Sequence, residues 1–253
     1  MIITDKFVFL HFAKNGGTFV TEVLKKVHSN MKKMENFLLP NIRWKGSNNN
    51  EYTPHNSYQQ IPEEHKNKPV ISTIRNPFDR YVSLYEFRQW VRQPRLDVKI
   101  IKEHFPSYPD LDFKQYLQFL NTLILQQMVY SDELKLDIGS YTFGFIKMFF
   151  KNPEQIIQNL NESYLISNNY TKDMPKIIFL RTENLNQDLF NALLNFGYAE
   201  KDIAFILKEE KSYPGGSTRG TLQKWEQYYT DELFEYVKWK DRFLLRVFPE
   251  YNV

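Results

Sequence analysis

The chain has 253 residues, a formal net charge of +3, 42% hydrophobic and 16% aromatic residues, and no cysteine. A chain of this length can bury roughly three quarters of the surface that its unfolded state exposes, so we expect one soluble domain over residues 1–253. The lack of cysteine excludes disulfides and thiolate metal sites, and the small net charge argues against a broad nucleic-acid-binding surface.

No stretch of the chain approaches the ~18 consecutive apolar residues of a membrane span. The N-terminal residues also lack the charged, apolar and small-residue pattern of a secretory signal peptide. We therefore expect a cytoplasmic protein without a membrane span. The composition does not predict an oligomeric state.

The first predicted element is a buried strand at residues 6–12, which leads into the loop Lys14–Thr18 with the sequence Lys-Asn-Gly-Gly-Thr. Two adjacent glycines allow the backbone to turn tightly and to point successive N–H groups into one concavity. A helix predicted over 18–29 adds the partial positive charge of its first turn, and Lys14 adds a full charge. This segment favours the binding of an anion such as a phosphate, and a plain sharp turn is the alternative.

This loop differs from the Walker A loop, in which the lysine follows the glycines, because here the lysine precedes them. After the first helix, residues 36–65 predict an irregular loop. Long irregular loops in compact domains are often functional, so we expect substrate-facing residues in this segment.

A second candidate motif follows a short β-branched strand predicted at 69–74. The strand ends at Arg75, and the Asn-Pro pair after it suits the cap and first turn of a helix predicted over 77–92. Ser83 lies about two turns along that helix. An arginine fork and a hydroxyl together can hold a second phosphate. The alternative is that Arg75 makes a structural ion pair and that Ser83 fills a small gap.

The remaining pattern predicts an α/β fold with a central parallel sheet flanked by helices. A strand is predicted at 176–181 and another at 163–167. Residues 88–165 are expected to form a mostly helical insertion. The later helices are predicted at 112–129, 153–161, 186–196, 200–210 and 230–247.

Together the two motifs resemble those of the 3'-phosphoadenosine-5'-phosphosulfate (PAPS) dependent sulfotransferases, above all the carbohydrate sulfotransferase-like branch, of the family 2 type. In that family a Lys-x-Gly-Gly-Thr loop binds the 5'-phosphosulfate. An Arg-[Asn/Asp]-Pro segment, with a serine eight positions after the arginine, binds the 3'-phosphate. The resemblance thus implies that the nucleotide is held by Lys14, Asn15, Gly16, Gly17, Thr18, Arg75 and Ser83.

Weaker similarity extends along the chain. Residues 177–185 look like the later strand and turn of the family, and residues 228–251 are similar to its closing helix. The loop that contains Arg219 and Gly220 lies where relatives place a flexible basic segment over the nucleotide. The resemblance implies a P-loop NTPase-like three-layer architecture with a helical insertion.

The reaction that the resemblance implies is an in-line displacement, in which positioning and charge stabilisation do most of the catalysis. An acceptor hydroxyl attacks the sulfur of PAPS, and adenosine 3',5'-bisphosphate (PAP) leaves. Lys14 would neutralise the charge that develops on the bridging oxygen. No metal is implied, because protein cations take its place. The expected acceptor is a glycan or a small molecule, with a carbohydrate hydroxyl as the leading expectation.

A general base is needed to take the proton of the acceptor hydroxyl. Among the five histidines, we expect His55 in this role, since it resembles the acceptor-side histidine that precedes the arginine motif in some relatives. The residues after it depart from the family pattern, and Glu22 is an alternative base. His11 is expected to pack near the nucleotide, and His28 and His104 are expected on the surface.

Two other classes of function stay open. A P-loop nucleotide kinase would need a lysine after the glycines and an acidic residue for magnesium, and the sequence has no clear match for either. A non-catalytic module could keep the nucleotide pocket without turnover, because a cofactor site alone does not specify an acceptor site.

Overall fold

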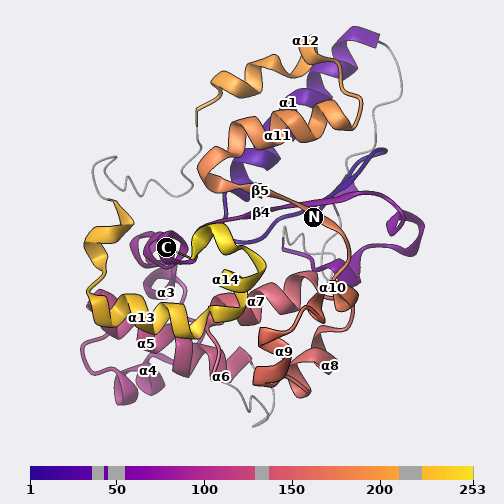
Figure 1. The fold of residues 1–253 in the computed structure, drawn as a ribbon. Helices are drawn as coiled ribbons and strands as arrows, with labels where there is room; N and C mark the ends of the chain where they lie inside the picture. The colour runs from indigo at the N-terminus through magenta and orange to yellow at the C-terminus, as the bar shows by residue number, and fades with distance from the viewer. Residues whose placement is uncertain (36–42, 45–54, 129–136, 211–223, 253) are drawn as a thin grey trace. The chain divides into compact units, whose positions relative to one another are not determined.

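The computed structural model describes residues 1–35, 43–44, 55–128, 137–210 and 224–252 (Figure 1). The chain divides into two compact units. Unit 1 comprises Met1–Arg75 and Pro175–Pro214, and unit 2 comprises Asn76–Met174 and Gly215–Val253. The expectation of a single domain stays a prediction.

Unit 1 is built on a five-stranded sheet with the strand order β3-β1-β2-β4-β5. Its strands are β1 (Ile2–Ile3), β2 (Val8–Leu10), β3 (Arg43–Trp44), β4 (Val70–Ile74) and β5 (Ile177–Arg181). β2, β4 and β5 run parallel, which confirms the predicted parallel centre. β1 pairs antiparallel with both β2 and β3, an edge that was not predicted because strands of two residues carry no readable periodicity.

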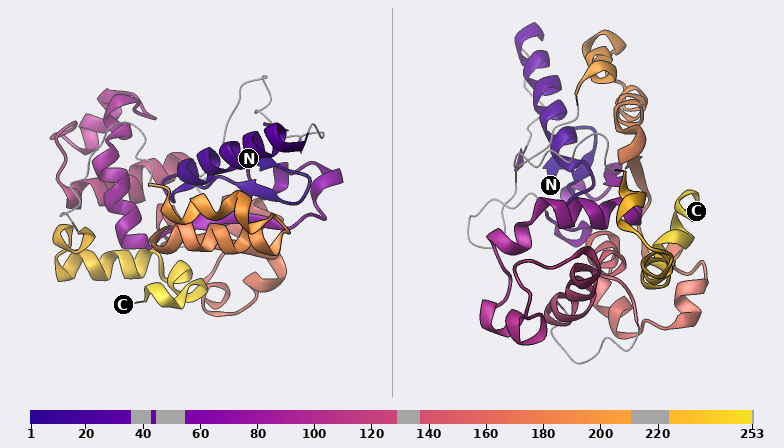
Figure 2. Two further views of the ribbon diagram at one scale, coloured as in Figure 1. Left: turned by 90° about the horizontal axis from the view of Figure 1, so that it is seen from above. Right: turned by 90° about the vertical axis from the view of Figure 1, so that its left-hand side faces the viewer.

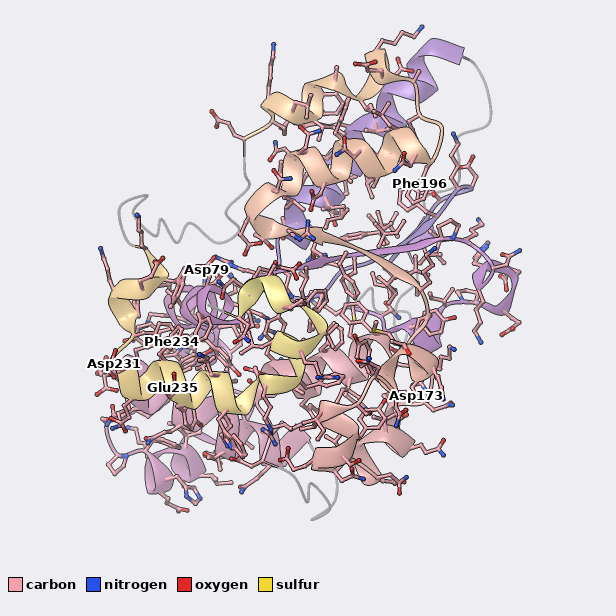
Figure 3. The ribbon with its side chains drawn as sticks, viewed as in Figure 1. Asp79, Asp173, Phe196, Asp231, Phe234 and Glu235 are labelled. Atoms are coloured by element: carbon pink, nitrogen blue, oxygen red, sulfur yellow. The ribbon has the colours of Figure 1, made fainter. Side chains whose placement is uncertain are left out.

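The α-helices described in unit 1 lie on one side of this sheet (Figures 1 and 2). They are α1 (Gly17–Glu35), α11 (Leu185–Asn195) and α12 (Glu200–Ile203), the last continued by a 3-10 turn at Ala204–Lys208. The apolar faces of these helices and the buried sheet residues form one hydrophobic core. At its edge Phe196, labelled in Figure 3, stacks on Phe7 with ring centroids 5.0 Å apart.

Every element described in unit 2 is helical. The α-helices are α2 (Pro77–Phe87), α3 (Gln89–Arg92), α4 (Val98–His104), α5 (Phe113–Phe119), α6 (Leu125–Met128), α7 (Ser140–Phe149), α8 (Pro153–Gln158), α9 (Glu162–Ile166), α10 (Tyr170–Asp173), α13 (Asp231–Lys240) and α14 (Arg242–Val247). A π-helical turn at Leu120–Ile124 joins α5 to α6. Among the described residues, no helix is both long and apolar enough to cross a membrane.

Several predictions about unit 2 are wrong in detail. The strand predicted at 163–167 is α9, because the side chain of Asn161 accepts a hydrogen bond from the backbone N–H of Tyr164 and caps a helical turn. The helix predicted over 77–92 breaks at Arg88, which has a left-handed φ of 49°. α7 was not predicted as a separate helix, and nearly all of its residues are buried.

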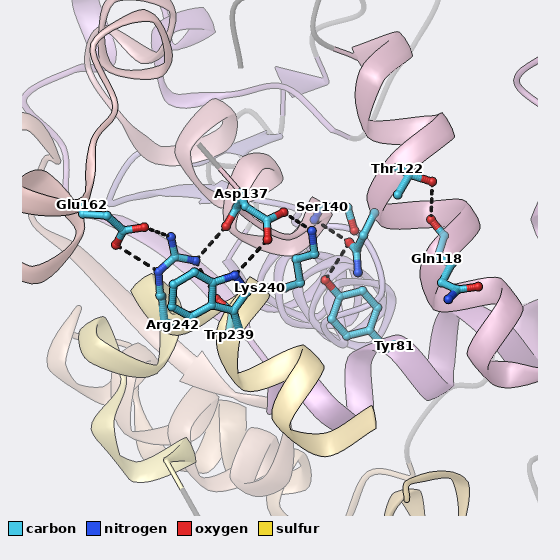
Figure 4. Close-up of polar contacts among 10 residues, drawn as sticks. Tyr81, Gln118, Thr122, Asp137, Ser140, Glu162, Trp239, Lys240 and Arg242 are labelled. Atoms are coloured by element: carbon cyan, nitrogen blue, oxygen red, sulfur yellow. Dashed lines mark hydrogen bonds and ion pairs between the residues drawn. The ribbon is translucent and has the colours of Figure 1, made fainter. Parts of the chain in front are cut away.

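Helix α2 is held inside unit 2 by a buried polar network, of which Figure 4 labels Tyr81. The Tyr81 hydroxyl lies 2.7 Å from Asp241 Oδ2 and 3.2 Å from Asn121 Oδ1. Asp241 Oδ1 also accepts from the backbone N–H and the hydroxyl of Thr142, at 2.9 and 2.8 Å. Fully buried Asp241 is thereby hydrogen-bonded on both oxygens. The network fixes the helix that carries Ser83.

Candidate functional site

In the loop between β2 and α1, the sign of φ alternates from residue to residue. Lys14 has a φ of 63° and Gly16 a φ of 83°, whereas Asn15 between them does not have a positive φ. Such alternation turns successive backbone N–H groups toward one concave side, which is the geometry of an anion-binding nest. A left-handed lysine is uncommon and persists only where its surroundings hold it.

Three consecutive carbonyls of this loop accept hydrogen bonds from side chains of unit 1. The carbonyl of Ala13 accepts from the Asn15 amide at 3.1 Å. The carbonyl of Lys14 accepts from Arg75 Nη1 at 3.4 Å. The carbonyl of Asn15 accepts from the Thr182 hydroxyl at 2.9 Å. The loop conformation is therefore secured from its carbonyl side.

The opposite side of the loop presents its amides. In a trans peptide the N–H points away from the carbonyl of the preceding residue, so these bonds direct the N–H groups of Lys14, Asn15 and Gly16 away from the anchoring side chains. α1 begins at Gly17, and the first N–H groups of a helix have no partner within it. The backbone of this loop is therefore compatible with the predicted binding of an anion, which stays a prediction.

Gly16 is required by its left-handed φ of 83°, and Gly17 is required by a close contact. A Cβ atom at Gly16 would lie 2.7 Å from Leu185 Cδ2. A Cβ atom at Gly17 would lie 2.2 Å from Cδ2 of the His11 ring. The His11 imidazole therefore packs directly against the start of α1, and its expected place near the nucleotide stays a prediction.

His55 lies beside His11 within unit 1. Its Nδ1 is 2.9 Å from the backbone carbonyl of His11, and the two rings are 4.9 Å apart with an interplanar angle of 74°. A carbonyl can only accept, so Nδ1 carries a proton, and Nε2 holds the lone pair whenever the ring is neutral. Burial lowers the pKa of His11 to about 3, and repulsion from the protonated form of His55 adds to this shift, so His11 stays neutral.

The other expected site residues lie in different parts of the chain. Arg75 ends the first segment of unit 1, whereas Ser83 is half-buried on α2 of unit 2, and their convergence on one phosphate stays a prediction. Thr18 is half-buried in the first turn of α1. Arg219 and Gly220 lie outside the described residues.

Two histidine expectations had opposite outcomes. His104 is exposed, as predicted. The prediction that His28 is on the surface is wrong, because His28 is only 2% exposed and packs edge-on against Tyr198. The alternative base, Glu22, is exposed on α1.

Sequence reasoning did not find Thr182 and Leu185 as parts of the site. Both follow β5, far along the chain from the loop that they contact. The only signal for them was the similarity of residues 177–185 to a later segment of the family.

A protein-family model described as "Sulfotransferase family" matches residues 1–135, just over half of the 253-residue chain. The chain therefore belongs to the sulfotransferase family, and it is an enzyme that uses PAPS as its sulfuryl donor. The match spans both predicted nucleotide-binding motifs and confirms the expected class and donor.

No curated protein matches the chain. Among solved structures, a crystal structure of mouse sulfotransferase SULT7A1 complexed with PAP matches at 12% sequence identity, with a TM-score of 0.47. That match covers 96% of this chain and 84% of the mouse chain.

Proposed function

We propose that this enzyme transfers the sulfuryl group of PAPS to a carbohydrate hydroxyl by in-line displacement, with His55 as the general base. The observation that carries the proposal is the proximity, within unit 1, of the nest at Lys14–Gly17 and the His11–His55 pair. A donor-phosphate cradle and a proton acceptor are the two components that such a transfer needs.

The nest would hold the 5'-phosphate end of the donor through its backbone N–H groups. Lys14 would neutralise the charge that develops as the bond between sulfur and the bridging oxygen breaks. Arg75 and Ser83 would hold the 3'-phosphate and distinguish PAPS from ATP, and the segment with Arg219 and Gly220 would cover the nucleotide.

His55 is assigned the removal of the proton from the acceptor hydroxyl. As the acceptor oxygen attacks sulfur, its proton passes to Nε2 of His55, and PAP leaves with the bridging oxygen. The carbonyl of His11, 2.9 Å from Nδ1, favours this direction because it stabilises the N–H of the resulting imidazolium. Exposure of the His55 side chain leaves room for an acceptor to approach.

The choice of a carbohydrate as acceptor depends on the resemblance of the two motifs to the carbohydrate branch. A cytoplasmic location, expected from the composition, is part of the same proposal. Neither follows from the backbone geometry of the loop.

The test is transfer of labelled sulfate from PAPS onto a panel of glycans, small alcohols and phenols. We expect labelled glycans, and we expect His55→Ala to lower kcat by about 100-fold or more while the Kd for PAP stays unchanged. Glu22→Gln is the matched comparison and should retain activity.

Two outcomes would contradict the proposal. Labelling of phenols alone would exclude the carbohydrate acceptor. Near-normal turnover by His55→Ala with normal PAP binding would exclude His55 as the base.

A further inference from the structure

One hydroxyl connects the two segments that are predicted to hold the phosphates of the donor. Thr182 follows the last residue of β5, and its Oγ1 lies 2.9 Å from the carbonyl oxygen of Asn15 and 2.9 Å from that of Ile74. A hydroxyl has one proton, so the two carbonyls share it or alternate in accepting it.

Each of these carbonyls belongs to a peptide next to a residue that is proposed to bind the donor. The Asn15 carbonyl belongs to the peptide whose N–H is that of Gly16, in the centre of the nest. The Ile74 carbonyl belongs to the peptide that leads into Arg75, at the end of β4. Arg75 in turn donates to the carbonyl of Lys14 at 3.4 Å. The nest and the arginine segment are therefore joined twice, once through Arg75 and once through Thr182.

The side of the loop that faces Thr182 is also closely packed. A Cβ atom at Gly16 would meet Leu185 Cδ2 at 2.7 Å and both Cγ2 and Oγ1 of Thr182 at 3.6 Å. The turn after β5 therefore supports the nest by contact as well as by a hydrogen bond. Rotation of the peptide between Asn15 and Gly16 would require this support to break.

We infer that Thr182 is a positioning residue for the donor nucleotide, which keeps the nest open and sets its spacing from Arg75. The inference rests on the proposed function, in which the nest and Arg75 hold the two ends of PAPS. Thr182 itself does not contact the reacting atoms. Its hydroxyl, and not its size, is the feature that the inference requires.

The discriminating variants are Thr182→Val, which keeps the shape and removes the donor, and Thr182→Ser, which keeps the donor. Thr122→Val is the matched control, because Thr122 donates to the Gln118 carbonyl at 2.7 Å within unit 2 (Figure 4). Calorimetric titration with PAP should give a Kd about tenfold higher for Thr182→Val. The other two variants should bind within about twofold of the unchanged protein.

Amide hydrogen exchange of a peptide that covers residues 13–18, measured without nucleotide, provides a second readout. Thr182→Val should exchange faster in this peptide, whereas Thr182→Ser and Thr122→Val should exchange as the unchanged protein does. This readout is independent of the proposed function. Failure of the unchanged protein to bind PAP would overturn that function, and the exchange rates would still decide the role of Thr182.

The inference is overturned if Thr182→Val leaves both the PAP affinity and the exchange of residues 13–18 unchanged. It is also overturned if Thr182→Ser loses as much as Thr182→Val, since the methyl group would then be the important contact.

Discussion

At the scale of single residues, side chains of the candidate site are held in one orientation by their neighbours. His11 illustrates this, because its ring fills the space where a side chain at Gly17 would lie and its carbonyl holds Nδ1 of His55. Gly17 is needed for this contact, whereas the left-handed φ is at Gly16. A sequence motif identifies the glycine, but the reason for it comes from a residue six positions earlier.

Buried neutral histidines predict that acid destabilises unit 1. The pKa of His11 is lowered to about 3, and burial also lowers the pKa of His28, which has no hydrogen-bond partner for either ring nitrogen among the described residues. The carboxylate of Asp5 opposes the shift of His28, and the ammonium of Lys6 adds to it. In the unfolded chain both histidines titrate near pH 6.5. The unfolded state therefore binds more protons below that pH, so stability is complete above about pH 6.5 and falls as the pH decreases toward 3.

Urea unfolding between pH 8 and 5 measures this dependence. Each histidine contributes at most about 1.4 kcal/mol per pH unit, and His28→Phe should reduce the slope. His104→Gln changes an exposed histidine and should leave the slope as it is. An unaltered slope in His28→Phe would show that His28 is not neutral in the folded protein.

At the scale of elements, helix ends are decided by tertiary contacts. The pattern predicts one helix over 230–247, but the structure ends α13 at Lys240 and begins α14 at Arg242. Asp241 lies between the two helices, and its carboxylate is buried and hydrogen-bonded inside unit 2. Hydrogen bonds from Tyr81 and Thr142 compensate for its burial, which by itself raises the pKa of the carboxyl.

Replacement of Asp241 by Asn should destabilise unit 2 by about 2–3 kcal/mol, since the amide keeps one acceptor and places N–H groups against a donor. Glu235→Gln, on an exposed position of α13 that Figure 3 labels, is the matched control and should change stability by less than about 0.5 kcal/mol. Chemical denaturation measures both. Equal stability of the two variants would contradict a structural role for the network.

At the scale of the whole molecule, a ligand that binds only the folded enzyme raises its stability. Arg75 and Ser83 are the residues proposed to hold the 3'-phosphate, a group that adenosine 5'-monophosphate lacks. PAP should therefore raise the Tm more than adenosine 5'-monophosphate does at equal concentration. Arg75→Ala and Ser83→Ala should each reduce that difference.

A thermal-shift comparison tests this prediction, with Ser163→Ala on an exposed position of α9 as the control for Ser83→Ala. A full PAP advantage in Ser83→Ala would remove Ser83 from the site. Stronger stabilisation by ATP with magnesium than by PAP would favour the nucleotide-kinase alternative for the pocket.

The amino-acid sequence was sufficient to predict the local strand–loop–helix motifs and the three central strands. Those features depend on short-range constraints, which include the freedom of Gly16 and Gly17, the fixed φ of Pro77 and the periodicity of apolar residues. The same constraints placed Lys14 and Arg75 next to turns that suit phosphate binding, and they were sufficient to suggest the family.

The distant groups that complete those motifs could be identified only from the folded structure. The bond between Thr182 and Asn15, the burial of His28 and the break at Asp241 depend on side chains that meet after folding. Such contacts produce no periodic pattern in the amino-acid sequence, because packing brings together residues that are far apart in the chain and overrides local propensity.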